Sequence, residues 1–292
     1  MHYNKLAFPT NGMGRLSDFA TDFTGSFSDS KEAEKELAKG INKLSKIQDK
    51  LYASNRYGLL IILQAMDAAG KDSTIKHVMS GINPQGCSVT SFKAPSTEEL
   101  DHDYLWRCMK LIPAKGDIGI FNRSYYEEVL VVRVHPEMLE GQKLPFLQPG
   151  IQPDESFWLQ RYSDINNFER YLHNNDISVL KFFLHVSKDE QKKRFLKRIE
   201  KPQKNWKLSD RDIVERKYWD DYQNAYEQTL IHTSTETAPW YVIPADHKWF
   251  MQLAVCRIII NHLETLGLDY PQSSKAQREA LERGKQMLLM EE

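Results

Sequence analysis

A short stretch between residues 64 and 76, QAMDAAGKDSTIK, carries residue types suited to binding phosphate. A common phosphate-binding loop has the pattern G-x-x-x-x-G-K-[ST] between a strand and a helix, where free N–H groups and the helix dipole favour an anion. Gly70 and Lys71 match this pattern, but Ala65 stands at the first glycine and Asp72 at the hydroxyl position. The stretch is therefore either a phosphate loop of a different kind or an ordinary strand-to-helix turn.

Asp67 lies inside this loop, where a carboxylate would repel phosphates unless a divalent cation lay between them. We therefore expect Asp67 to bind Mg²⁺, which prefers carboxylate oxygens, with Mn²⁺ as the alternative. Ser73 and Thr74 are candidates for the hydroxyl that Asp72 displaces. The phosphate- and nucleotide-binding residues expected here are Ala68, Ala69, Gly70, Asp72, Ser73, Thr74 and Lys76.

A second group of candidate residues lies in GIFNRSYYEE, residues 119–128. Asn122 and Arg123 would emerge at the carboxyl end of a strand, where ligands bind in open α/β sheets. The planar fork of Arg123 suits phosphate oxygens, and Glu127 follows one helical turn later. The expected metal ligands are Asp67 together with Asn122 or Glu127, and Glu127 is also a candidate for holding a nucleotide.

The segment 188–207 is strongly basic, with nine Lys or Arg against three acidic residues, a net of +6. Because the whole chain has a net charge of −1, the remaining residues sum to −7. Arg194, Lys197, Arg198 and Lys201 are spaced so that they share one helix face. The run is either a solvated helix face or a track that holds a polyanion on a mobile lid.

The elements that must position these residues follow from the pattern of apolar residues. We predict strands at 58–65, 87–92, 117–121, 177–186 and 240–245. We predict helices at 31–54, 70–82, 97–113, 124–134, 153–175, 187–201, 211–234 and 247–266, and an irregular loop at 135–153. Alternating strands and helices indicate a parallel sheet covered on both faces. One α/β domain is expected over residues 1–292, with an N-terminal arm at 1–30, a lid at about 194–222 and a C-terminal helical appendage at about 270–292.

The composition narrows the class of protein. With 292 residues, 41% hydrophobic and 27% charged, the chain predicts a soluble globular protein. It has no apolar run of about 18 residues and no secretion signal, so we expect no membrane association. Cys87, Cys108 and Cys256 lack metal-ligand spacing and suit a reducing cytoplasm. The balance of 39 basic against 40 acidic residues argues against a general nucleic-acid binder.

Taken together, these motifs resemble the polyphosphate kinase 2 family over roughly residues 40–265. The loop DAAGK, without a hydroxyl residue after the lysine, is similar to that of the family, as are FNRSYYEEVL and the lid segment that begins RFLKRIEK. NPQGCSVTSFKAPS and DHDYLWR also fit. The resemblance implies a P-loop kinase-like α/β fold of the thymidylate-kinase type, a parallel sheet flanked by helices, with a helical lid.

The resemblance also implies Mg²⁺-dependent transfer of a phosphoryl group between inorganic polyphosphate and a nucleotide. The catalytic residues that it implies are Asp67, Lys71, Arg123, Glu127, Arg194 and Arg198, and Lys93, Arg107 and Arg133 join the phosphate- and nucleotide-binding set. The chain resembles the class III branch, which accepts AMP as well as ADP, and Glu127 matches the residue tied to that range. GMP and GDP are expected as further acceptors, and the family implies a homo-oligomer, either dimer or tetramer.

Asn122 departs from the family pattern, because many members have aspartate there. Two other classes of function stay open: an ordinary ATP-dependent nucleotide kinase, and a non-catalytic sensor of polyphosphate or nucleotide. The chain has no Ser-His-Asp arrangement, so His77, His102 and His135 are expected to be structural. The aromatic residues expected to pack in the lid or core, one of which is a candidate for stacking on a base, are Trp206, Tyr218, Trp219 and Tyr222.

Overall fold

The computed structural model describes residues 3–147, 150, 152–207 and 209–291. The side chains of Lys204, Trp206 and Lys207 lie outside the described part. The sequence places Lys204 and Lys207 in the basic run and predicts that Trp206 packs in the lid or core. These roles remain predictions.

Five parallel strands form one sheet in the order β2-β3-β1-β4-β5. The strands are β1 (Gly58–Gln64), β2 (Cys87–Ser91), β3 (Ile118–Asn122), β4 (Ile177–His185) and β5 (Trp240–Pro244). All five lie where the sequence predicts strands. β1 is central and buried along its whole length, as a continuous apolar run requires. Because the chain forms β2 before it returns to β3, the carboxyl ends of β1 and β3 meet at a topological switch point.

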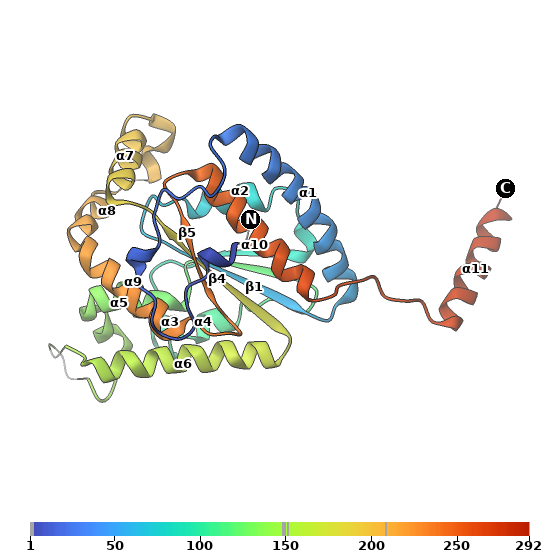
Figure 1. Ribbon diagram of the computed structural model, residues 1–292. Coiled ribbons are helices and arrows are strands. Elements are labelled where there is room, and N and C mark those ends of the chain that lie inside the picture. Colours follow the sequence, from blue (N-terminus) through green and yellow to red (C-terminus); the bar gives the residue numbers. More distant parts are fainter. Residues whose placement is uncertain (1–2, 148–149, 151, 208, 292) are drawn as a thin grey trace.

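Helices cover both faces of the sheet (Figure 1). On one face, α1 (Ser30–Ser54) and α2 (Lys71–Val78) pack against α10 (Lys248–Thr265). On the other, α6 (Glu155–Asn174) packs against α9 (Trp219–Thr233) and β4. The predicted parallel sheet flanked by helices is therefore confirmed.

Two of the predicted helices are interrupted. The helix expected at 97–113 consists of α3 (Thr97–Leu100) and α4 (Trp106–Met109), because the carboxylate of Asp103 accepts a bond from the backbone of Leu105 and forms a local turn. The helix expected at 211–234 is divided into α8 (Asp210–Val214), a 3₁₀ turn at Glu215–Tyr218 and α9.

Three smaller differences lie at element ends. The helix expected at 124–134 is a 3₁₀ turn, Tyr125–Val129, followed by the short α5 (Val131–Val134), and α2 ends at Val78, before residue 82. The irregular segment 135–153 contains a 3₁₀ turn, Pro136–Gln142. The basic helix α7 (Lys188–Ile199) begins where expected, with Ser187 capping it through a bond from Glu190 N.

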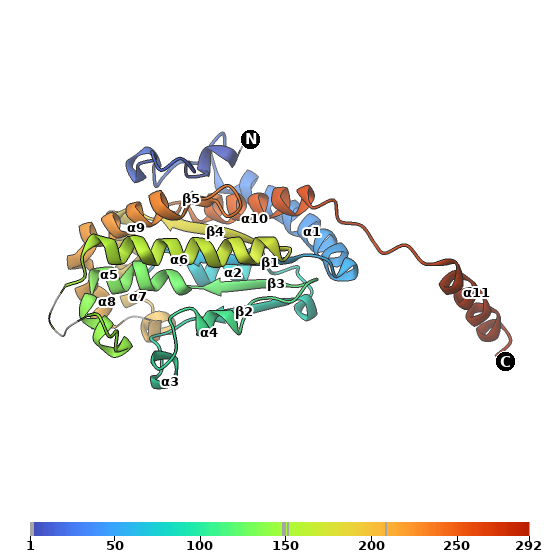
Figure 2. The same cartoon turned by 90° about the horizontal axis from the view of Figure 1, so that it is seen from below.

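The N-terminal segment before α1 packs along the edge of the sheet (Figure 2). Phe8 is buried, its N–H donates to the carbonyl of Trp240 at 2.8 Å, and Ala7 forms an antiparallel bridge with Tyr241 in β5. Thr21 bonds twice to Asp246: its hydroxyl donates to Oδ2 at 2.8 Å, and its carbonyl accepts from the Asp246 N–H at 3.0 Å. The arm is therefore part of the folded body.

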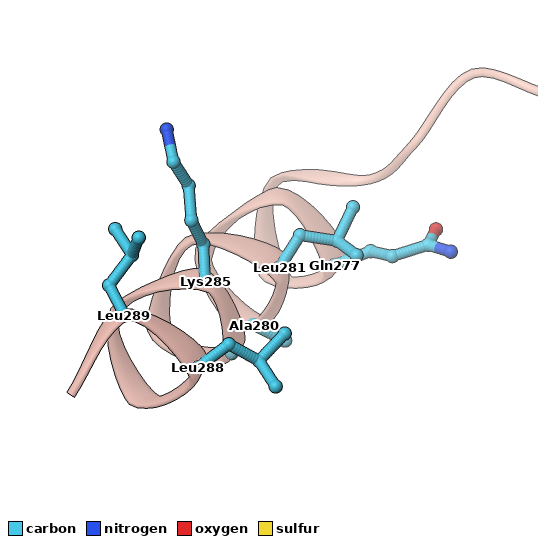
Figure 3. Close-up of a pocket in the computed structure, with 7 residues that line it drawn as sticks. Gln277, Ala280, Leu281, Lys285, Leu288 and Leu289 are labelled. Carbon is cyan, nitrogen blue, oxygen red and sulfur yellow. The ribbon is translucent and has the colours of Figure 1, made fainter. Parts of the chain in front are cut away.

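The helix α11 (Lys275–Leu289) stands away from the body at the end of an extended segment (Figures 1 and 2). It has no buried residue. Leu281, Leu288 and Leu289 are among the side chains that extend from it (Figure 3), and each is more than three-fifths exposed. Among the described residues, no helix combines the length and apolar character that crossing a membrane requires.

Candidate active site

The loop between β1 and α2 has the backbone shape that a phosphate loop needs. Ala68 and Gly70 adopt left-handed φ angles of 61° and 121°, which turn the chain sharply between strand and helix. At Gly70 a side chain would be strained by the backbone angle, and its Cβ would lie 3.0 Å from the Cε atom of Met251. Strand, loop and helix thus follow in the order that the motif requires.

Lys71 is the first residue of α2, and its ammonium group folds back over the loop. Its Nζ donates to the carbonyl of Ala65 at 2.8 Å. Burial, the largest cause, and the charge of Arg123 together lower the pKa of Lys71 to about 8, against the opposing effect of Asp67 and Glu127. Ala65, the residue that breaks the usual pattern, contributes a backbone carbonyl that any residue type could supply.

Arg123 joins the ends of β1 and β3. Its guanidinium donates from NH2 to Asp67 Oδ1 at 2.9 Å and from NH1 to Glu127 Oε2 at 2.8 Å. These contacts raise the pKa of Arg123, with Glu127 the larger cause, against the effect of burial. Arg123 adopts a left-handed φ of 67°, and its N–H donates to the carbonyl of Leu63 in β1. The sheet thus brings Asp67 to Arg123 and Glu127, from which it lies more than 50 positions away in sequence.

Asp67 and Glu127 are the two carboxylates that meet here, both through Arg123. Asn122 points elsewhere: its Nδ2 donates to Asp72 Oδ1 at 2.9 Å and to Ser91 Oγ at 3.4 Å. Within the described part of the chain no group of three or more His, Cys, Asp or Glu could hold a metal ion alone. Mg²⁺ is commonly bound by one or two carboxylates together with substrate phosphates. The donor set therefore fits a Mg²⁺ ion shared with phosphate, and does not fit a site made by protein alone.

The two hydroxyl candidates, Ser73 and Thr74, both donate to the carbonyl of Gly70, at 2.9 and 3.1 Å. These bonds lie within the first turn of α2. Lys76 is exposed on the same helix. In the observed arrangement the hydroxyls thus face the helix backbone.

Arg194 lies behind the loop and is buried, with a side chain 7% exposed. Its NH1 donates to the carbonyls of Ala68 and Ala69, at 3.2 and 2.5 Å. Its NH2 donates to those of Ala245 and Asp246, at 2.5 and 3.0 Å. Arg198, one turn further along α7, is half-buried and lies over the ring of Phe195. The two arginines expected to act together are thus in different environments.

The remaining predicted binding residues are spread over two regions. Arg107 is buried, and its NH1 donates at 2.8 Å to the carbonyl of Lys93, whose own side chain is exposed after β2. Arg133 faces α6, where it donates to the hydroxyl of Tyr162 and to Glu155. Neither arginine lines the cavity beside Arg123.

That cavity has a volume of about 40 Å³, far below the roughly 300–1,000 Å³ of pockets that hold small molecules. It is lined by Asp67, Arg123 and Glu127 on the sheet side, and by Asp212, Glu215 and Arg216 from the segment predicted to be a lid. Residues of the segment predicted to be a lid therefore line the same cavity as Asp67, and in this arrangement the cavity is too small for a nucleotide.

Contacts of the predicted lid segment involve Gln191, Glu215 and Arg216, which the sequence reasoning missed, together with His135 and Tyr222, for which it expected structural and packing roles. His135 Nε2 lies 2.9 Å from Glu215 Oε2, which also accepts from the hydroxyl of Tyr222 at 2.9 Å. Arg216 NH1 donates to Gln191 Oε1 at 2.5 Å. The only available signal was the position of Gln191 three residues before Arg194, on one face of a predicted helix.

The chain is similar to proteins of one known family. The family model described as polyphosphate kinase 2 matches residues 27–270. The chain belongs to the polyphosphate kinase 2 family. The ADP-polyphosphate phosphotransferase of Rhodopseudomonas palustris is 53% identical over 90% of this chain and 90% of that protein. The AMP/ADP-polyphosphate phosphotransferase of Meiothermus ruber is 43% identical over 93% of this chain and 97% of that protein.

A solved structure supports the same conclusion. The polyphosphate kinase 2 of Arthrobacter aurescens TC1 superposes with a TM-score of 0.84 at 38% identity, over 94% of both chains. The P-loop kinase-like fold expected from the resemblance is confirmed. The α11 helix and most of the N-terminal arm lie outside the residues that the family model matches.

Proposed function

We propose that this protein transfers a phosphoryl group from inorganic polyphosphate to AMP and ADP, in a reversible reaction that shortens the polyphosphate by one phosphate per turnover. The observation that carries the proposal is the convergence of Lys71, Asp67 and Arg123 around one loop at the switch point of the sheet. The names of the two relatives above support the donor and both acceptors.

The reaction needs positioning and charge neutralisation more than covalent chemistry. The loop N–H groups and Lys71 would cradle the donor phosphates, and Arg123 would offset the charge that develops on the transferred group. A terminal oxygen of the acceptor phosphate attacks the terminal phosphorus of the donor, and the bond to the remaining polyphosphate breaks. That acceptor oxygen is already anionic, so no side chain has to remove a proton.

Asp67 and Glu127 are the residues that would hold the divalent cation, for which we propose Mg²⁺ with Mn²⁺ as the alternative. When bound, the cation would neutralise phosphate charge at the point of transfer. In the observed arrangement Arg123 neutralises both carboxylates. We propose that phosphate competes for Arg123 and frees the carboxylates for the cation.

For the acceptor we propose the region of Lys93 and Arg107 beside β2, with GMP and GDP as further substrates. Glu127 lines the cavity beside the loop, and we propose that it serves monophosphate acceptors there, as the resemblance implies. We also propose that Arg198, which is half-buried on α7, contacts the polyphosphate chain.

The decisive assay incubates the protein with AMP, Mg²⁺ and polyphosphate as the only phosphoryl donor. We expect ADP and then ATP, detected by chromatography, with no product when the metal is chelated. The Lys71→Ala variant should lose turnover by roughly a hundredfold or more. An ATP-dependent kinase would form ADP from AMP only when ATP replaces polyphosphate, and a sensor would bind polyphosphate without any turnover.

We also propose that the protein self-associates as a dimer or tetramer and resides in the cytoplasm. The free cysteines Cys87, Cys108 and Cys256 suit a reducing compartment. The edge strand β2 exposes Val89, and Met109 and Leu111 are also exposed nearby in sequence. Analytical ultracentrifugation tests the association: a single species with the mass of one chain at micromolar concentration would contradict it.

A further inference from the structure

Gln191 and Arg194 hold three successive carbonyl groups of the phosphate loop from one helix. Gln191 Nε2 donates to the carbonyl of Asp67 at 2.9 Å, and Arg194 holds those of Ala68 and Ala69. Lying three positions apart on α7, the two side chains project from one helix face. They therefore act on the loop from a single rigid element.

The direction of these carbonyls determines the direction of the loop N–H groups. In a trans peptide the C=O and N–H groups point to opposite sides. Holding the carbonyls of Asp67 and Ala69 toward α7 thus turns the N–H groups of Ala68 and Gly70 away from α7. The peptide between them closes the turn, with the Ala69 N–H donating to the carbonyl of Met66 at 3.3 Å.

The guanidinium of Arg194 has no donor left for a ligand. A guanidinium carries five N–H donors. Two bond the loop, two bond the carbonyls of Ala245 and Asp246 after β5, and Nε bonds Glu190 Oε1 at 2.8 Å. The side chain thus spans the gap between the phosphate loop and the turn that follows β5.

We infer that Arg194, supported by Gln191, is a positioning residue that keeps the loop in its phosphate-binding conformation. This inference rests on the proposed role of the loop, and it replaces the catalytic role that the resemblance implied for Arg194. A lysine cannot take over this role, because its donors lie on one nitrogen and cannot form the planar fork that reaches both turns.

The test compares Arg194→Lys and Arg194→Gln with a matched control, Arg170→Lys, on the exposed side of α6. We expect kcat with polyphosphate to fall roughly a hundredfold in both Arg194 variants, with the KM for AMP unchanged. Hydrogen–deuterium exchange of residues 65–71 should become faster in both, whereas that of β4 and α10 should stay as in the wild type. The control should leave kinetics and exchange unchanged.

Two results would overturn the inference. If Arg194→Lys kept about a third or more of the wild-type kcat, positive charge rather than the fork would explain the residue. Unchanged exchange in residues 65–71 would show that the loop does not depend on Arg194.

Should the Arg194 variants fail to fold, Gln191→Ala carries the same exchange test, because it releases the carbonyl of Asp67 and leaves the bonds of Arg194 to the loop in place. It also removes the acceptor of Arg216 NH1, which lies outside the loop. Faster exchange at 65–71 supports the inference, and wild-type exchange there overturns it. The exchange measurement needs no turnover. A wild-type protein inactive with polyphosphate would therefore refute the proposed function without deciding this one.

Discussion

Lys71 carries a positive charge in a position that disfavours it until a phosphate arrives. Its pKa is lowered from 10.5 to about 8, mainly by burial, and its Nζ donates a hydrogen bond to the carbonyl of Ala65. A phosphate beside the ammonium would raise that pKa again, because an opposite charge favours the charged form. The affinity of the site for phosphate and the protonation of Lys71 are therefore linked.

We accordingly predict proton uptake when polyphosphate binds above pH 8. Free protein is then partly neutral at Lys71, and the bound state is charged, so kcat/KM for polyphosphate should decline as pH rises beyond about 8. Calorimetric titration at pH 8.5 in buffers of different ionisation enthalpy measures the uptake. Lys71→Met serves as the control that should show none. Equal heats in all buffers for the wild type would contradict the prediction.

Lys71 also affects stability in a defined direction. Between pH 8 and 10.5 the unfolded chain holds a proton at this lysine that the folded chain has released. The contribution of Lys71 to the free energy of unfolding therefore rises with pH over that window.

We predict that Glu127 determines whether the protein accepts AMP as well as ADP. It shares Arg123 with Asp67, so its loss changes the charge beside the acceptor while Asp67 stays in place. Glu127→Ala should reduce kcat/KM for AMP by about tenfold more than that for ADP. Steady-state rates with AMP and with ADP measure the ratio of the two kcat/KM values. Glu128→Ala is unsuitable as a control, because Glu128 is buried against Arg161. Glu140→Ala, exposed beyond α5, is a better control. Equal losses for AMP and ADP would refute the role.

At the scale of elements, a buried ion pair ties the site to α6. Lys181 of β4 and Glu169 of α6 lie 2.6 Å apart and are fully buried, and burial lowers the pKa of Lys181 against the effect of Glu169. The hydroxyls of Tyr125 and Tyr126 donate to the same carboxylate. The turn that follows Arg123 is thereby anchored to the helix layer.

Removing one partner of this pair should be costly. Glu169→Ala leaves a buried ammonium without its partner, and we expect the free energy of unfolding to fall by about 3–5 kcal/mol. Urea denaturation measures the change. Arg170→Ala, the neighbouring exposed position, should change it by less than about 0.5 kcal/mol. A similarly small effect for Glu169→Ala would show that the pair is dispensable.

The helix α11 should contribute nothing to the stability of the body, because no residue in it is buried. Ending the chain after Tyr270 should leave the melting temperature and the turnover of polyphosphate unchanged. Leu263→Ala, in the buried face of α10, is the positive control and should cost about 2–5 kcal/mol. A large loss of stability on truncation would mean that α11 packs against the body or a second copy in solution.

The strands, the helices and the residues of the candidate active site differ in how well the sequence predicts them. The strands were predictable because continuous apolar runs such as 58–64 have few alternatives. The helices at 97–113 and 211–234 were not, since local bonds such as that from Leu105 N to Asp103 compete with helix formation. Lys71 and Arg123 could be found from their motifs. The bond between Gln191 and Asp67 joins residues 124 positions apart, and only the tertiary fold shows it.

At the scale of the whole molecule, charged residues are unevenly distributed along the chain: the segment 188–207 carries a net charge of +6, and the rest of the chain carries −7. A polyanion approaching the loop is attracted to the exposed cations of this segment. Such attraction between exposed charges is screened by salt, with a Debye length near 10 Å at 0.1 M.

We therefore predict that the KM for polyphosphate rises several-fold between about 50 and 200 mM NaCl, while the KM for AMP changes less. The double variant Lys197→Gln/Lys201→Gln should weaken this salt dependence, since both side chains are exposed on or beside α7. Lys31→Gln/Lys35→Gln, exposed on α1, provides a control with the same change in net charge. Identical salt dependence in both double variants would count against a polyanion track on α7.

The two bonds between Thr21 and Asp246 bear on where shortened versions of this protein can safely begin. Asp246 also offers its carbonyl to Arg194, so the N-terminal arm reaches the phosphate loop through two residues. A version trimmed to the family borders would start at residue 27 and lose Thr21, together with the buried Phe8 and Leu16. The residues matched by the family model are thus fewer than those that pack into the body, and a purification tag is better placed after α11 than in front of the arm.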